Sequence, residues 1–107
     1  VLTHAHIDHT GYLPVLVKRG FQGKIYSTPA TRDLCRILLP DCGKLLEEEA
    51  EYANRRGFSK HKPALPLYTQ EDGERTIEFF STEDFHRDFA LPGGLSCKFQ
   101  HSGHILG

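Results

Sequence analysis

The sequence predicts one domain of the α/β class, in which short β-strands alternate with helices. Short apolar runs such as Lys24–Thr28 show the period of two that is typical of a strand, and longer segments show the i, i+4, i+7 spacing of an amphipathic helix. At 107 residues the chain is one domain at most, and its 38% of hydrophobic residues is enough for a core. No run approaches the ~20 apolar residues of a membrane span, so we expect no membrane association.

The first quarter of the chain predicts two strands around a short helix. Val1–Thr3 is apolar and is expected to be the end of a buried strand. Thr10–Lys18 has its leucines and valines spaced for one helical face, and Gly20 is expected to end that helix. Lys24–Thr28 follows as a second short strand, with alternate residues on opposite faces.

The clearest helix begins after Thr28. That threonine can cap it, and Pro29 suits the first helical position because its missing N–H would be unpaired there anyway. The expected inward face is a stripe of four apolar residues: Ala30, Leu34, Ile37 and Leu38. Pro40 predicts a break or kink near Leu39, after which the helix resumes and ends at Gly57.

The C-terminal half predicts a third helix and a hairpin. Thr69–Asp72 has the pattern of a capping box for a helix that ends near Phe80. Phe85–Ala90 and Leu95–His101 are expected to be two strands, joined by a turn at Leu91–Gly94.

The two ends of the chain lie within or beside the segments that carry its candidate functional residues. Residue 1 is not Met, and the chain stops three residues after His104. We expect residues 1–107 to be an internal fragment of a larger domain.

Charge and cysteine content exclude some partners and compartments. The formal net charge of −1 gives no overall attraction to nucleic acid. The three cysteines form no CxxC pair, and their odd number argues against a disulfide framework. This cysteine usage favours a reducing, cytoplasmic location.

Four side chains of the type that bind metals are crowded into "HAHIDH", residues 4–9. In an extended segment His4 and His6 project to the same side, while Asp8 and His9 would turn to an adjacent point if a helix follows. Imidazoles with one carboxylate suit zinc, and iron or manganese would also be accepted. A polar surface loop is the alternative, but this spacing after an apolar strand favours a metal site, and two metals could share it.

The motif and its flanks resemble a known family. "HAHIDH" resembles the signature of the metallo-β-lactamase superfamily, and "SGHILG" (Ser102–Gly107) resembles its next metal-ligand motif. The flanking "GYLPVLVKRGFQGKIYSTPATRDL" and "EEEAEYANRRGFSKHKPALPLYTQED" resemble the β-CASP branch. That branch comprises RNA-processing nucleases related to the cleavage-and-polyadenylation endonuclease, and the bacterial members look most similar. The resemblance implies a partial αββα sandwich.

The resemblance also implies a ligand set for two zinc ions. His4, His6 and His104 would bind the first zinc, and Asp8 and His9 the second. A hydroxide bound by both metals would attack an RNA phosphodiester, with Asp8 as the catalytic residue that holds or accepts a proton. A bridging aspartate and the β-CASP domain lie outside this chain, so we expect the fragment alone to be inactive and poorly folded or self-associating. A homo-oligomer of the intact protein is compatible with the sequence.

The other histidines have no ligand pattern of their own. His101 precedes His104 by three residues, and strand alternation would point it to the opposite face, which favours a structural or supporting role. His61 and His86 stand in loop or strand contexts without partners, and surface roles are expected for both.

A basic loop is the candidate RNA contact. Residues Arg55–Lys62 ("RRGFSKHK") follow an acidic run and include Lys60 and Lys62, which are expected to bind RNA phosphates if the loop lies near the site. A solvated surface loop is the equally weighted alternative.

Two other functions remain open at this point. Small-molecule hydrolases of the same fold, acting on a lactam or a thioester, share the HxHxDH motif, although they would not be expected to carry the β-CASP-like flanks. A non-catalytic scaffold subunit is the second alternative, and the retained ligands argue against it. The sequence does not decide between endonuclease and exonuclease, or between RNA and DNA.

Overall fold

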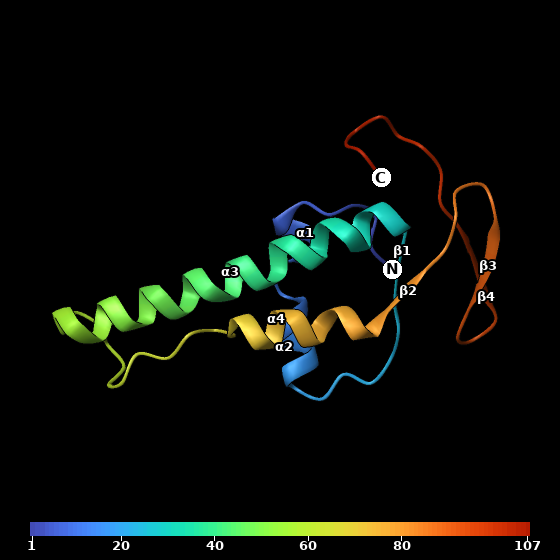
Figure 1. Cartoon of the computed structure of the whole chain (residues 1–107). Helices are drawn as coiled ribbons and strands as arrows, with labels where there is room; N and C mark the ends of the chain where they lie inside the picture. Colours follow the sequence, from blue (N-terminus) through green and yellow to red (C-terminus); the bar gives the residue numbers. More distant parts are fainter.

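The structure is a computed structural model that describes residues 1–107. The chain combines helices with short strands, which confirms the α/β class (Figure 1). The elements are α1 (Ile7–Thr10), α2 (Leu13–Lys18), β1 (Ile25–Ser27), α3 (Pro29–Arg56), α4 (Gln70–Thr76), a 3-10 turn (Ile77–Phe79), β2 (Phe80–Thr82), β3 (Asp88–Leu91) and β4 (Leu95–Lys98). The full αββα sandwich needs strands beyond those present and stays an expectation.

Helix α3 begins and ends where the sequence predicts. The Thr28 hydroxyl accepts the backbone N–H of Thr31 at 3.3 Å, Pro29 occupies the first turn, and Gly57 ends the helix with a positive φ of 68°. The prediction was a break or a kink near Leu39. The kink stays a prediction, but the break is wrong, because the helix continues through Pro40. We attribute this to tertiary contact, since helix α4 packs directly on this turn and holds it helical.

The contact between α3 and α4 is a close approach of two backbones. A Cβ added at Gly43 of α3 would lie 2.3 Å from the Thr69 carbonyl oxygen. A Cβ added at Gly73 of α4 would lie 2.6 Å from the Leu39 carbonyl oxygen. Both positions therefore require glycine, because any side chain would prevent this close spacing of the helices. That requirement outweighs the low helix propensity of glycine.

The buried face of α3 differs from the predicted stripe. Ile37 is 69% exposed, and Leu34 and Leu38 are half-buried against the core. The fully inward positions are Thr31, Cys35, Leu39 and Gly43. Small and polar side chains face inward because neighbouring segments approach α3 closely, and a count of apolar residues cannot anticipate that.

Helix α4 is held at its start by the predicted capping box. The Thr69 hydroxyl accepts the Asp72 N–H at 3.1 Å, and the Asp72 carboxylate accepts the Thr69 N–H at 3.0 Å. Lys18 of α2 lies 3.3 Å from the same carboxylate. Burial raises the pKa of Asp72, but the hydrogen bond from the Thr69 backbone, together with Lys18, outweighs burial. The pKa of Asp72 is therefore lowered.

The first part of the chain contains two short helices where one was expected over Thr10–Lys18. Helix α1 ends at Thr10, and α2 starts at Leu13 after a turn. Pro14 explains the break, because a proline lacks the N–H that would continue the helix from α1.

The strands form two separate pairs. β1 lies parallel to β2, with Ile25 opposite Phe80, and β3 and β4 form an antiparallel hairpin. The predicted strand over Lys24–Thr28 and the predicted hairpin are confirmed with shorter bounds, whereas β2 was not predicted because it follows its helix without a turn signal. Val1–Thr3 is not a strand, which corrects the prediction. It runs beside β1, and the Leu2 N–H donates to the Tyr26 carbonyl at 2.8 Å.

The core is small and lies where the N-terminal segment meets α3. Its buried members are Leu2, Ala5, Ile25, Cys35 and Leu39. The distal half of α3 extends away from this core, so the molecule measures 52 × 29 × 19 Å (Figure 1). None of its helices combines the length and apolar character that crossing a membrane requires.

Replacing Gly43 with alanine is expected to destabilise the fold by about 1–3 kcal/mol, because the added methyl group would force α3 and α4 apart. In an exposed helix the same change would stabilise by ~1 kcal/mol. Thermal unfolding of the protein would measure the effect, with the exposed neighbour Lys44→Ala as control. A midpoint that rises in Gly43→Ala would contradict the close-packing account.

Candidate metal centre

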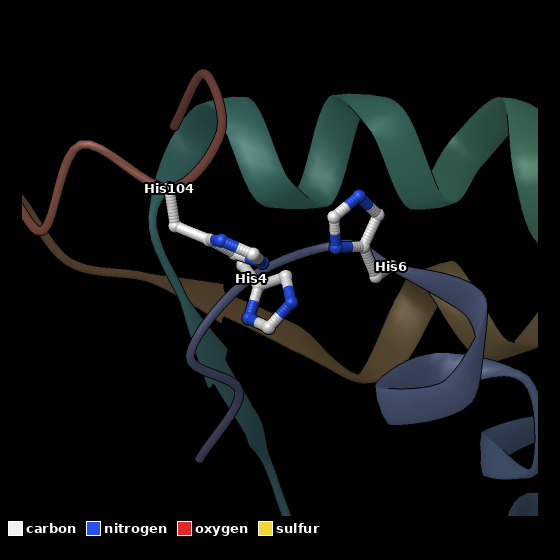
Figure 2. A group of neighbouring side chains, drawn as sticks. All are labelled: His4, His6 and His104. Carbon is white, nitrogen blue, oxygen red and sulfur yellow. The ribbon is translucent and has the colours of Figure 1, made fainter.

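Three imidazoles from the two ends of the chain converge on one point. His4 and His6 come from the loop before α1, and His104 comes from the C-terminal segment (Figure 2). One nitrogen of each ring lies within 4.8 Å of the other two. The ring centroids are separated by 4.9, 4.8 and 5.1 Å. The two histidine motifs that the sequence singled out are thus adjacent in space.

His4 is held by one ring nitrogen and left unpaired at the other. Its Nδ1 lies 2.9 Å from the Thr3 hydroxyl, while its buried Nε2 has no hydrogen-bond partner. A buried polar atom without a partner costs free energy, which a bound metal ion would offset. The unpaired Nε2 of His4 is free to bind a metal ion, so the residues present fit a metal site.

The electrostatics of His4 also suit a metal ligand. Burial lowers the pKa of His4 below its ordinary value, and the nearby His9, His104 and His6 lower it further against a smaller opposing effect of Asp8. The imidazole therefore stays neutral to lower pH, and the neutral form is the one that binds metal.

The loop that carries His6 is fixed by its own backbone bonds. The His6 carbonyl accepts the N–H groups of His9 and Thr10 at 2.9 and 3.2 Å as α1 begins. The fully buried Thr10 hydroxyl also lies 3.3 Å from the Ala5 carbonyl and 3.2 Å from that of His6. The loop conformation is thus set without a metal.

Asp8 and His9 lie at the border of the three-imidazole group. The His9 ring centroid is 4.2 Å from that of His4, and His9 Nε2 is 3.4 Å from the Asp8 carboxylate. Both side chains are exposed. They form a pair of donors beside His4, but they do not belong to the group whose three donors all lie within 4.8 Å.

Lys60 and Lys62 do not lie near the histidines. Their loop follows the far end of α3, whereas the histidines lie beside its N-terminal half (Figures 1 and 2). A helix of 28 residues rises about 42 Å, so this loop is remote from the metal centre. The condition that the loop lies near the histidines is therefore not met within this chain, and RNA binding at the loop stays a prediction.

His101 lies on the same side as His104, whereas strand alternation had predicted the opposite face. Its ring stacks on Phe85 with centroids 3.8 Å apart, and both line a hollow of about 220 Å³ together with His4 and His104. Strand alternation does not apply here, because β4 ends at Lys98 and the following segment is irregular. The three-residue spacing from His104 was the signal available in the sequence.

Comparison with known proteins gives relatives over the whole chain. No family model matches the chain. It is 33% identical to Ribonuclease TTHA0252 of Thermus thermophilus, 33% to Transcription termination factor FttA of Thermococcus kodakarensis and 32% to Endoribonuclease YSH1 of Eremothecium gossypii. All of this chain is covered in each case, together with 21%, 15% and 13% of the respective relatives.

The chain therefore spans about a fifth or less of the length of the curated relatives that it matches. Because the match is complete, both histidine motifs fall within the shared region. The motifs, the convergence of their imidazoles and these relatives agree, and together they fit a segment of a β-CASP metallo-β-lactamase domain.

Proposed function

We propose that residues 1–107 are the metal-binding segment of a larger zinc-dependent ribonuclease that hydrolyses RNA phosphodiesters. The observation that carries the proposal is the unpaired Nε2 of His4 within a group of three imidazoles. The relatives named as a ribonuclease and an endoribonuclease support RNA as the substrate. The free cysteines fit a cytoplasmic location.

The chain's own residues divide into two donor sets. His4, His6 and His104 would hold a first zinc ion, with the Thr3 hydroxyl fixing the orientation of the His4 ring. Asp8 and His9 would contribute to a second. Two zinc ions, or manganese or iron in their place, would supply a hydroxide nucleophile at neutral pH and offset charge on the phosphate.

Asp8 is proposed as the residue that accepts or holds the proton of the attacking water. Its side chain is 77% exposed and touches His9, so it is available at the edge of the site. His6 and His104 are also exposed, which leaves the centre open to a long polymer. A small-molecule hydrolase and a scaffold subunit are the outcomes that the experiments must separate from this proposal.

Replacing His104 with alanine in the full-length protein that carries this segment is expected to remove at least one equivalent of zinc, because the first ion loses one of its three protein donors. Elemental analysis after dialysis would measure the metal content. His61→Ala, an exposed loop histidine, is the control and should keep its zinc. An unchanged zinc content in His104→Ala would refute the ligand assignment.

Cleavage of a labelled single-stranded RNA by the same protein tests the reaction. Asp8→Ala and a metal chelator are each expected to lower the rate by at least 100-fold, because proton transfer contributes about 10²–10⁴ and the metals more. Asp33→Ala, which removes an exposed carboxylate paired with Arg32, is the control. Hydrolysis of a lactam or thioester without RNA cleavage would favour the small-molecule alternative. Bound zinc without any hydrolysis would favour the scaffold alternative.

The remote basic loop gives a prediction that depends on substrate length. In the double variant Lys60→Ala/Lys62→Ala, binding of a long RNA should weaken, and the slope of log K against log salt should fall by about 1.4 because two phosphate contacts are lost. Cleavage of a dinucleotide should not change, since it cannot reach the far end of α3. An unchanged salt slope would show that the loop is solvated surface.

A further inference from the structure

The segment that carries His104 is attached to the rest of the molecule at few points. Residues 100–107 contain no helix or strand, and most are exposed. Ile105 packs against the core, and His101 stacks on Phe85. The only hydrogen bonds from this segment to the rest of the chain are two that the Gly107 backbone oxygen accepts.

Both of these bonds come from the first turn of α3. The Thr28 hydroxyl donates to the Gly107 oxygen at 2.5 Å, and the Thr31 hydroxyl donates to it at 3.0 Å. The two threonines are 2% and 0% exposed. The two bonds are partly buried and their donors are fully buried, so leaving either hydroxyl unpaired would cost free energy and each resists release of the segment.

Capping of the helix does not account for both hydroxyls. The Thr28 oxygen accepts the Thr31 N–H as a cap, and its proton has two acceptors within reach, the Gly107 oxygen at 2.5 Å and the Thr31 hydroxyl oxygen at 3.1 Å. The Thr31 hydroxyl caps no backbone N–H of the helix: its oxygen accepts from the Thr28 hydroxyl, and its own proton goes to the Gly107 oxygen. Thr31 is thus the position at which holding the segment can be distinguished from starting the helix.

The approach of the segment to α3 also depends on Gly107 itself. A Cβ added there would lie 2.4 Å from the Ala30 Cβ, and the residue has a positive φ of 81°. A glycine is therefore needed for the backbone oxygen to reach both threonines.

The same junction holds the other half of the centre. The Leu2 N–H donates to the Tyr26 carbonyl in β1, two residues before the cap, and the loop with His4 and His6 follows Leu2 directly. Residues 26–31 therefore anchor both of the segments from which the three imidazoles come.

We propose that Thr28 and Thr31 are positioning residues of the metal centre, which hold the Gly107 oxygen and so fix His104 opposite His4 and His6. The inference rests on the proposed function and adds to it a pair of residues that touch no metal. Groups that orient metal ligands in this way typically change metal affinity by 10- to 100-fold when they are removed.

Thr31→Val in the full-length protein is the first test, because it removes the hydroxyl and keeps the branched shape. Thr76→Val is the matched control, since Thr76 is also fully buried and its hydroxyl donates to the Asp72 carbonyl at 2.7 Å in a helix away from the histidines. Thr31→Ser keeps the donor and should behave as the wild type.

Two measurements report on the contact. Hydrogen exchange of a peptide covering residues 100–107, in zinc-free protein, measures how firmly the segment is held. Competition with a chromophoric chelator gives the zinc Kd. Thr31→Val is expected to exchange faster in this peptide and to bind zinc 10- to 100-fold more weakly, while Thr76→Val and Thr31→Ser stay within about twofold of the wild type.

Gly107→Ala is expected to break the same contact at its acceptor, without changing the sequence of α3. It should reproduce both effects of Thr31→Val, whereas Gly93→Ala, which imposes a similar positive φ in open space, should not. This second pair keeps the test decisive if Thr31→Val folds poorly.

The outcomes separate the inference from the function on which it rests. Wild-type zinc binding with no change of exchange or Kd in Thr31→Val and Gly107→Ala would overturn the positioning role alone. Equal losses in Thr31→Val and Thr76→Val would overturn it as well, because the effect would then be general destabilisation. A wild-type protein that binds no zinc would overturn the proposed function and the positioning role together.

Discussion

The turn from β1 into α3 is the junction on which the other segments depend. Within six residues it pairs with the N-terminal segment through Tyr26, joins the parallel strand β2 and starts the long helix at Thr28. The same turn receives the Gly107 oxygen from the other end of the chain. Since these bonds are buried or partly buried, moving the junction would disturb both of the segments that supply histidines.

The group of three imidazoles has a free-energy cost that the rest of the fold must offset. His4 is desolvated beside three other imidazoles, its pKa is lowered, and its Nε2 lacks a partner. Such an arrangement destabilises the metal-free protein and favours a ligand that accepts electron pairs from several neutral imidazoles. The small core offers limited compensation, so the site and the fold are coupled, and metal binding would stabilise both.

Much of this protein could be predicted from local chemistry in the sequence. The cap at Thr28, the capping box at Thr69, the stop at Gly57 and the turn between β3 and β4 are each set by residues within a few positions of one another. The crowding of histidines at residues 4–9 likewise indicated the candidate site. These features depend on short-range backbone bonds and side-chain type, which sequence spacing specifies directly.

Contacts between distant segments decided the rest. Helix α3 continues through Pro40 because α4 packs on that turn, and glycines 43 and 73 permit the approach. His104 joins His4 and His6 because its segment folds back onto the start of α3, where the sequence shows only two threonines. The length of α3 separates the basic loop from the histidines, a distance that the charge pattern alone does not reveal. Sequence by itself determined which groups could bind a metal, and tertiary structure decided which of them meet, because their distances depend on packing between segments far apart in the chain.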